Sequence, residues 1–287
     1  MPTQGASFNP DTDIPSLEGK VILITSANSG MGKQSALQLA KHKLAHIWMA
    51  ARSPEKGNEA VADIESQIPG ANATFLELDL CSFDSIKSAA KAVLESSPRL
   101  DILYLNSSAA PPKLTKDGYE IQMGTNHLGH ALLLKLLTPL MVKTASSRPV
   151  RVVSLASAAR KYAGPEKIQF ETLKSLEGVT PLNRYVQSKI AIMLYPQEFT
   201  KHHPELTIVS IDPGVVSTQL FSREPGDEQV LHLQTELAPK LVRPVEEGVK
   251  NQLWAATAEG VASGLHYEPV GLAKNVWEWT QKELKGQ

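Results

Sequence analysis

The stretch VILITSANSGMG at residues 21–32 decides the fold class of this chain. Its first five residues are apolar or β-branched, as in a strand that is buried on both faces. A turn with two glycines, Gly30 and Gly32, follows, and a helical pattern begins at the second of them. Glycine permits a tight turn and a close approach of backbone amides to a ligand. A strand, a glycine turn and a helix in this order predict the opening unit of an open α/β sheet.

Short apolar runs recur along the chain and alternate with helical patterns, which indicates strands joined by crossover helices. Each run is short enough for a strand buried on both faces, so we expect the strands to lie parallel. The predicted strands are 21–25, 46–50, 74–78, 102–105, 150–155, 207–211 and 265–268, and the predicted helices are 32–43, 55–66, 82–95, 119–142 and 185–202. The fold class is therefore predicted to be α/β, a Rossmann-type doubly wound parallel sheet of about seven strands with helices on both faces.

No linker interrupts this alternation, so residues 19–287 are predicted to form a single domain after a loose, polar lead-in at 1–18. Residues 216–245 differ from the rest because they hold several prolines around a short amphipathic piece, 228–237. Ligands of open α/β sheets bind beyond the carboxyl ends of the strands, and this segment follows such an end. We interpret 216–245 as a substrate lid, with an ordinary surface excursion as the alternative.

The composition restricts the partners and the compartment. The chain has 287 residues, with 29 Lys and Arg against 30 Asp and Glu, a formal net charge of −1. A balanced charge without a basic block gives no electrostatic reason to expect nucleic acid or an anionic membrane as a partner. Cys81 is the single cysteine, which excludes an internal disulfide and favours a reducing compartment. No secretory signal and no apolar run near the roughly 20 residues of a membrane span are visible, so we predict a cytoplasmic protein without a membrane span.

Two histidines, His127 and His130, lie three residues apart in a predicted helix, a spacing that two metal ligands can share. No Asp, Cys or third His stands at a matching spacing in the sequence. Packing or helix-surface roles are therefore favoured, and no metal site is predicted.

The turn after the first strand is suited to phosphate. Backbone amides at the N-terminus of a helix favour a pyrophosphate, since the helix dipole adds a positive potential there. We expect this turn to bind a dinucleotide, and a tight turn without a ligand is the alternative. The expected contacts are Ser26, Asn28, Ser29, Gly30, Met31 and Gly32.

Arg52 and Ser53 follow the second predicted strand, where the ribose of a dinucleotide is recognised. An acidic residue there would bind the 2′-hydroxyl of NAD, whereas a cation favours the 2′-phosphate of NADP. We therefore predict NADP(H) as the cofactor, with a solvated surface arginine as the alternative. Asp79 ends the third strand, and it could accept from the adenine amino group or cap the helix that begins near Ser82.

Tyr185 and Lys189 are four residues apart and so share one face of a predicted helix. A phenol is mostly protonated at neutral pH, and an adjacent ammonium lowers its pKa and makes it a usable proton donor or acceptor. The spacing alone is common on amphipathic helices. Two further residues supply a context: Ser157 follows the fifth strand and could hold a substrate oxygen, and Asn126 could anchor a water chain to Lys189.

These features, in this order, resemble the short-chain dehydrogenase/reductase family. The resemblance covers residues 19 to about 271 and includes NHLGH at 126–130, YVQSK at 185–189, DPG at 212–214 and GLHYEPVG at 264–271. The branch that it resembles is the retinol-dehydrogenase-like one, which includes many fungal carbonyl reductases.

The resemblance implies a nicotinamide-dependent oxidoreductase in which Tyr185 protonates a carbonyl oxygen as hydride arrives from the cofactor. It implies that Lys189 lowers the pKa of Tyr185 and holds the nicotinamide ribose, that Ser157 orients the carbonyl, and that Asn126 holds a relay water. Family members are often dimers or tetramers, so a homo-oligomer is one expected state. The further cofactor contacts that it implies are Asp79, Leu80, Asn106, Ser107, Tyr185, Lys189, Pro213, Gly214, Val216 and Thr218.

Several positions depart from the family pattern. The usual first glycine of the turn is Ser26, which would store on the order of 1 kcal/mol of strain if the backbone needs a positive φ there. The usual Asn-Ala-Gly is Asn106-Ser107-Ser108, which adds bulk beside the adenosine half of the cofactor. Pro196 lies inside the helix that is predicted to begin near Tyr185, and it should kink or end that helix because it lacks the amide hydrogen that would bond to Ile192.

The leading hypothesis is an NADP(H)-dependent reductase of a fairly apolar ketone or aldehyde, and a secondary metabolite is the more specific substrate class. The segments expected to line the substrate site, 108–114, 158–164 and 216–245, contain Tyr162 and Phe221. The alternative is a non-redox protein on the same fold, either a cyclase or a ligand-binding regulator. It is motivated by the altered turns at Ser26 and Ser107.

Overall fold

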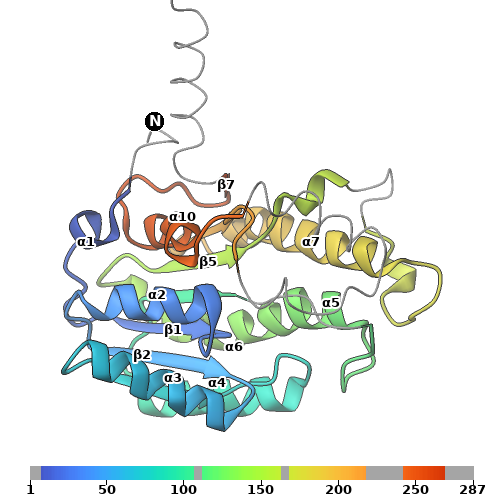
Figure 1. Cartoon of the computed structure of the whole chain (residues 1–287). Coiled ribbons are helices and arrows are strands. Elements are labelled where there is room, and N and C mark those ends of the chain that lie inside the picture. The colour runs from blue at the N-terminus through green and yellow to red at the C-terminus, as the bar shows by residue number, and fades with distance from the viewer. Residues whose placement is uncertain (1–7, 107–111, 163–167, 218–241, 269–287) are drawn as a thin grey trace, which may run out of the picture.

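The computed structural model of the chain describes residues 8–106, 112–162, 168–217 and 242–268 (Figure 1). Seven parallel strands form one sheet in the order β3-β2-β1-β4-β5-β6-β7. The strands are β1 Val21–Thr25, β2 His46–Ala51, β3 Ala73–Glu77, β4 Ile102–Leu105, β5 Arg151–Leu155, β6 Thr207–Ile211 and β7 His266–Tyr267. The predicted fold class is confirmed.

Helices cover both faces of the sheet, because alternate residues of the central strands enter separate hydrophobic clusters. In β1, Ile22 and Ile24 belong to one cluster, and Val21 and Leu23 belong to the other. Helices α2, α3 and α10 contribute to the first cluster, and α4, α6 and α7 contribute to the second (Figure 1). The helices are α1 Pro10–Asp13, α2 Gly30–Ala40, α3 Pro54–Gln67, α4 Phe83–Ser96, α5 Ile121–Met123, α6 His130–Ala145, α7 Pro181–His202 and α10 Val245–Thr257, with a π-helical turn at Gly124–Gly129 and 3₁₀ turns at Ala158–Tyr162 and Phe170–Thr172.

The central position of β1 places the candidate site. Strand β2 pairs with one edge of β1 and β4 with the other, so the strand order reverses beside β1. Crossover connections leave in opposite directions at such a point, and a crevice opens beyond the carboxyl ends of the strands. The turns after β1, β2, β4, β5 and β6 all reach this one edge of the sheet.

Two segments differ from the prediction. The lead-in is not loose from residue 8 onward, because α1 forms there and Phe8, Ile14 and Leu17 are buried in the core. Helix α10 was not predicted, although Val249, Leu253 and Ala256 repeat at helical spacing and are buried. Of the predicted lid 216–245, residues 218–241 lie outside the described residues, and the flanking ends pair through a parallel bridge between Val216 and Arg243.

The helix that carries Tyr185 begins earlier than predicted, and it does not end at Pro196. Helix α7 begins at Pro181, four residues before Tyr185, and it continues through Pro196 to His202. The missing amide hydrogen of a proline costs one helical bond, yet Pro196 itself is buried and contributes packing. The burial of this face against the sheet outweighs the local loss.

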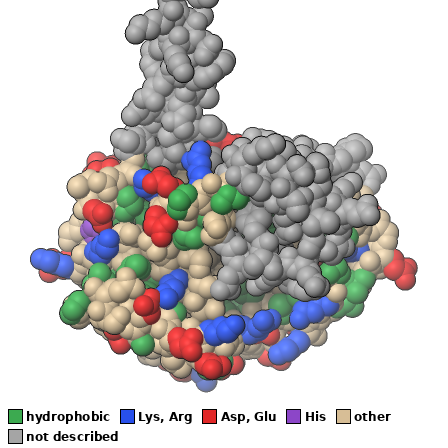
Figure 2. Space-filling model, viewed as in Figure 1, with side chains coloured by type: hydrophobic (Ala, Val, Ile, Leu, Met, Phe, Trp, Pro, Cys, Tyr) green, Lys and Arg blue, Asp and Glu red, His purple; other side chains and the backbone are tan. Residues whose placement is uncertain are grey.

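The continuous helical stretch Ile121–Ala145 is the one part of the described chain that is long and apolar enough to cross a membrane. It has 25 residues with a mean hydropathy of 1.2, and half of its most apolar window is buried inside the protein. A single stretch of this kind is weak evidence for a membrane span, since core helices of soluble proteins share these features. On the face shown in Figure 2, acidic and basic side chains are intermixed, in keeping with the net charge of −1.

Candidate active site

The turn between β1 and α2 has the backbone of a tight phosphate-binding turn. Ser26 and Gly30 have positive φ angles of 51° and 52°. Gly32 is required by space, because a Cβ atom there would lie 2.4 Å from the Ser26 carbonyl oxygen and 2.7 Å from Asn106 Nδ2. Asn28, Ser29 and Met31 are partly exposed around the start of α2. The expected strain at Ser26 is therefore present in the backbone.

The residues at the ends of β2 and β3 have different surroundings. Arg52 is exposed and has no hydrogen-bond or ion-pair partner among the described residues. Ser53 is the N-cap of α3, where its hydroxyl accepts from the Lys56 amide at 3.4 Å. Asp79 accepts from the Cys81 amide at 3.0 Å and lies 3.7 Å from Lys116 Nζ. Since Ser82 is the N-cap of α4, the suggestion that Asp79 caps this helix was wrong.

The predicted contacts after β4 and β6 are described in part. Asn106 is buried, and its backbone amide donates to Thr25 Oγ1 at 2.8 Å. After β6, Gly214 has a φ of 78° and donates its amide to Asp212 Oδ1 at 2.9 Å. The other described members of this set, Leu80, Pro213 and Val216, are buried. Ser107 and Thr218 lie outside the described residues, as do Phe221 and most of the segment 108–114.

Asn126 lies in the π-helical turn that separates α5 from α6, at the catalytic side of the crevice. A π turn bonds residue i to i+5 and is often found at functional sites. The Asn126 side chain is fully buried, and its amide donates to Ser188 Oγ at 3.0 Å and to Gln122 Oε1 at 3.3 Å. Ser188 Oγ in turn donates to the Tyr185 carbonyl at 2.7 Å. Asn126 is thereby joined to helix α7 between its two predicted catalytic residues.

Tyr185 and Lys189 lie on one face of α7, as predicted. Lys189 Nζ is 5.6 Å from the centroid of the Tyr185 ring and donates to the Leu155 carbonyl, at the end of β5, at 2.8 Å. The Lys189 side chain is buried, whereas Tyr185 is partly exposed. Ser157 follows β5, and its hydroxyl accepts from the Ala159 amide at 3.2 Å. The structure therefore brings together all four predicted catalytic residues.

Burial dominates the electrostatics of this group. Burial raises the pKa of the Tyr185 phenol, the interaction with the Ser157 hydroxyl lowers it, and the Asp212 carboxylate raises it. Burial also lowers the pKa of Lys189 to about 8, against the opposing effect of Asp212. The net direction of the Tyr185 pKa is opposite to the predicted lowering by Lys189, since burial is the largest cause and the Lys189 ammonium donates to the Leu155 carbonyl.

Comparisons with known proteins identify the family of the chain. Residues 20–229 match the family described as short chain dehydrogenase. The chain is a short-chain dehydrogenase/reductase. It is 36% identical to an uncharacterized oxidoreductase of Schizosaccharomyces pombe, over 87% of this chain and 76% of that protein. It is also 34% identical to human retinol dehydrogenase 13, over 88% and 77% of the two chains. These relatives place this short-chain dehydrogenase/reductase in the retinol-dehydrogenase-like branch of an oxidoreductase family.

A solved structure shows the same fold. L-sorbose reductase from Gluconobacter frateurii, in complex with NADPH and L-sorbose, superimposes with a TM-score of 0.69. The match covers 89% of this short-chain dehydrogenase/reductase and 97% of that chain, at 18% identity. At this identity the likeness concerns the fold alone.

Short-chain dehydrogenase/reductases use a nicotinamide dinucleotide, and the residues of this member fit such a cofactor. The absence of a side chain at Gly32 keeps the turn tight and the α2 N-terminus open. The turn, Arg52, Asn106 and Lys189 all follow or face the carboxyl ends of parallel strands, along one continuous edge. Among the described residues, no group of three or more His, Cys, Asp and Glu side chains is arranged to hold a metal ion.

Sequence reasoning missed the residues that influence the pKa values of the site and hold its backbone. Asp212 belongs to the DPG motif and had no predicted role, yet its carboxylate raises the pKa of both Tyr185 and Lys189. Neighbouring side-chain amides of α10 bond to the ends of two strand-to-helix connections: Asn251 donates to the Asp212 carbonyl at 2.6 Å, and Gln252 donates to the Met31 carbonyl at 3.2 Å. The only sequence signal was a pair of polar residues inside an apolar helical pattern.

Proposed function

We propose that the protein is an NADPH-dependent carbonyl reductase in which Tyr185 is the general acid. The observation that carries this proposal is the grouping of the Tyr185 phenol, the Ser157 hydroxyl and the buried Lys189 ammonium at the carboxyl end of β5. A pure ligand-binding protein would gain nothing from a buried ammonium beside a phenol, because burying a charge is costly.

The mechanism uses the protonated phenol. The reduced nicotinamide, when bound, supplies the hydride. Because burial raises the pKa of Tyr185, its phenol stays protonated at neutral pH and can donate its proton from Oη to the carbonyl oxygen of the substrate. The Ser157 hydroxyl would donate to the same oxygen and orient it. The hydrogen bonds from Asn126 through Ser188 to the Tyr185 carbonyl keep this turn of α7 in place.

Lys189 would stabilise the phenolate that remains after proton transfer. Its ammonium faces the Tyr185 ring at 5.6 Å and is held by the Leu155 carbonyl. We propose that Lys189 also holds the nicotinamide ribose, as the family resemblance implies. A positive charge is worth more in this buried setting than in water, because the local dielectric constant is low.

The preference for NADPH is proposed from Arg52. Its guanidinium is exposed at the end of β2 and is not engaged by any described residue. Arginine binds phosphate with a planar, bidentate geometry, so it suits the 2′-phosphate that distinguishes NADPH from NADH. The NADPH in the complex of L-sorbose reductase shows that the same fold accepts this cofactor.

The substrate is proposed to be an apolar ketone or aldehyde. The segments expected to line its site contain several leucines, among them Leu220 and Leu231, together with Tyr162 and Phe221. The name of the human relative denotes an apolar alcohol. A secondary metabolite is the more specific proposal. The non-redox alternative draws support from the strained Ser26, which makes the turn less favourable than a glycine would.

The deciding experiment measures binding and turnover separately. Fluorescence titration with NADPH and with NADH gives the cofactor preference, and the reduced-nicotinamide absorbance is then followed with aromatic and alicyclic ketones and aldehydes. Tyr185→Phe should lower kcat by about 10²–10⁴-fold and leave NADPH affinity nearly unchanged, since only the proton donor is lost. Tyr195→Phe, on the same helix, is the matched control and should keep the activity. NADPH binding without turnover of any carbonyl would favour the non-redox alternative.

A further inference from the structure

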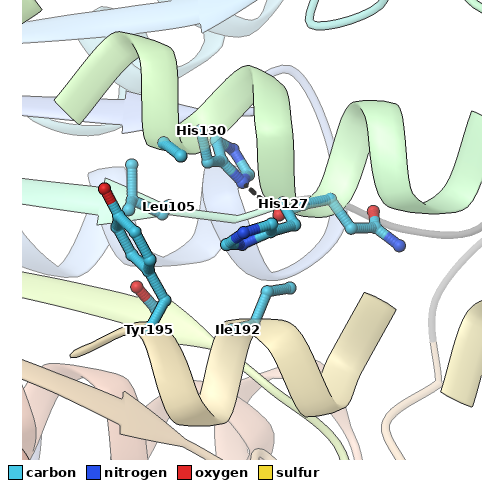
Figure 3. A pocket seen from close by; sticks show the side chains of 8 residues that line it. Leu105, His127, His130, Ile192 and Tyr195 are labelled. Atoms are coloured by element: carbon cyan, nitrogen blue, oxygen red, sulfur yellow. Dashed lines mark hydrogen bonds between the residues drawn. The ribbon is translucent and has the colours of Figure 1, made fainter. Parts of the chain in front are cut away.

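A buried histidine links the two halves of the crevice. His130 begins α6, directly after the π turn, and its side chain lines a small cavity with His127, Ile192 and Tyr195 (Figure 3). Its Nδ1 atom is 2.9 Å from the Asn126 carbonyl oxygen, and its Nε2 atom is 3.0 Å from Thr25 Oγ1. Thr25 ends β1, so the imidazole joins the strand before the phosphate-binding turn to the turn that carries Asn126.

The partners determine which nitrogen carries the proton. A carbonyl oxygen only accepts, so Nδ1 must be the donor to Asn126. Burial lowers the pKa of His130 to about 3, which keeps the ring neutral and leaves Nε2 as an acceptor. The Thr25 hydroxyl therefore donates to Nε2 or to the Asn106 carbonyl, which lies 2.8 Å away. The direction of the hydrogen bond at Nδ1 is therefore fixed, whereas the acceptor of the Thr25 hydroxyl is not.

The hydrogen bond from His130 is accepted by the Asn126 carbonyl, which lies within the π turn at Gly124–Gly129. Its i to i+5 pattern shifts the pairing between carbonyls and amides relative to an α-helix. The turn is also tightly packed, since a Cβ atom on Gly129 would lie 2.6 Å from the Leu80 carbonyl oxygen. The hydrogen bond from His130 Nδ1 holds the backbone carbonyl of Asn126, while the side chain of Asn126 donates to Ser188.

We propose that His130 is a positioning residue, which holds the Asn126 carbonyl through Nδ1 and ties the π turn to the nucleotide-binding end of β1. This inference rests on the proposed function, because it treats Asn126 as part of a catalytic site. It also makes a claim about the protein alone, namely that the hydrogen bond from His130 keeps residues 124–129 in their wide turn.

The test compares two amide substitutions with opposite geometry. In His130→Asn the side-chain nitrogen can stand near the place of Nδ1 and can still donate to the Asn126 carbonyl. In His130→Gln the amide reaches instead toward the place of Nε2 and Thr25. The matched control is His127→Phe, because His127 is the other histidine of the cavity and its ring packs edge-on against Tyr195 at 5.2 Å.

We expect His130→Gln to lower kcat by about tenfold or more while KM for the ketone changes by less than about threefold, since misplaced catalytic groups affect the chemical step. His130→Asn should retain kcat within about threefold, and His127→Phe should match the wild type. Equal losses in the Asn and Gln variants, or an equal loss in His127→Phe, would overturn the proposal.

A second measurement does not depend on catalysis. Hydrogen exchange of the amides of residues 124–129, measured without cofactor, should be about tenfold faster in His130→Gln than in the wild type or His130→Asn. Unchanged exchange in His130→Gln would reject the positioning role even if no carbonyl substrate were found. Faster exchange in a protein without carbonyl turnover would instead uphold the link and reject the proposed function.

Discussion

The nucleotide half and the catalytic half of the crevice are built in different ways. The turn after β1 depends on backbone shape, with Ser26 at a positive φ and Gly32 in a space that no side chain can share. The catalytic half depends on side-chain charge, with the Lys189 ammonium buried beside Tyr185. We expect the turn after β1 to be more sensitive to changes of shape than to changes of charge, and the catalytic half to show the reverse.

The strongest test of this contrast is Lys189→Met, which keeps the length of the side chain and removes its charge. We expect kcat to fall by about 10²-fold or more, because the phenolate at Tyr185 loses its stabilising ammonium. The melting temperature should stay equal or rise, since the desolvation cost of the buried charge disappears. A large loss of stability together with retained turnover would contradict the contrast.

The same variant gives a pH dependence with a definite sign. Burial lowers the pKa of Lys189 to about 8 in the folded protein, against 10.5 as its ordinary value. Between these pH values the unfolded chain binds more protons, so the stability contributed by Lys189 rises with pH. Urea unfolding should therefore show the wild type gaining stability relative to Lys189→Met between about pH 8 and 10.5, and a fixed difference would count against this pKa.

On the nucleotide half, Gly32→Ala should weaken NADPH binding by at least about tenfold. The added methyl group would collide with the Ser26 carbonyl oxygen and with the side-chain amide of Asn106. Gly57→Ala is the matched control, since its Cβ would also clash, at 2.1 Å from the Phe75 ring. Fluorescence titration should show weak binding for Gly32→Ala alone, while thermal unfolding shows both variants destabilised. Equal loss of binding in both would mean that stability, and not the turn, controls affinity.

The smallest expected effect belongs to Ser26→Gly. Relief of the positive φ should raise the free energy of unfolding by less than about 1 kcal/mol, because the greater freedom of glycine in the unfolded chain offsets part of the gain. NADPH binding should tighten a few-fold at most, as measured by titration. Weaker binding would show that the serine hydroxyl contacts the cofactor and contributes more than its strain removes.

The strands were the most predictable part of the fold. β1, β4 and β6 begin and end where the sequence predicts, because a strand buried on both faces leaves an unbroken apolar run. Helix α10 was missed because buried amides of Asn251 and Gln252 interrupt its apolar pattern, and their partners at Asp212 and Met31 are distant in sequence.

The catalytic residues could be predicted as a set, whereas their electrostatics could not. The spacing of Tyr185 and Lys189 places them on one helical face, but the depth of their burial depends on the whole fold. The role of His130 was hidden for a similar reason. Its contact with Thr25 spans 105 residues of sequence, and no local pattern distinguishes it from a histidine that only packs.

Helix α10 also has a consequence for how this crevice can change. Asn251 and Gln252 are consecutive, so a single peptide unit spans the interval between the Asp212 and Met31 anchors. Each residue of an α-helix turns the chain by about 100°. Inserting one residue between them would swing one amide out of reach of its carbonyl. The register of α10 therefore fixes the spacing between the Asp212 and Met31 carbonyls, and length variation should be confined to the connections on either side of this helix.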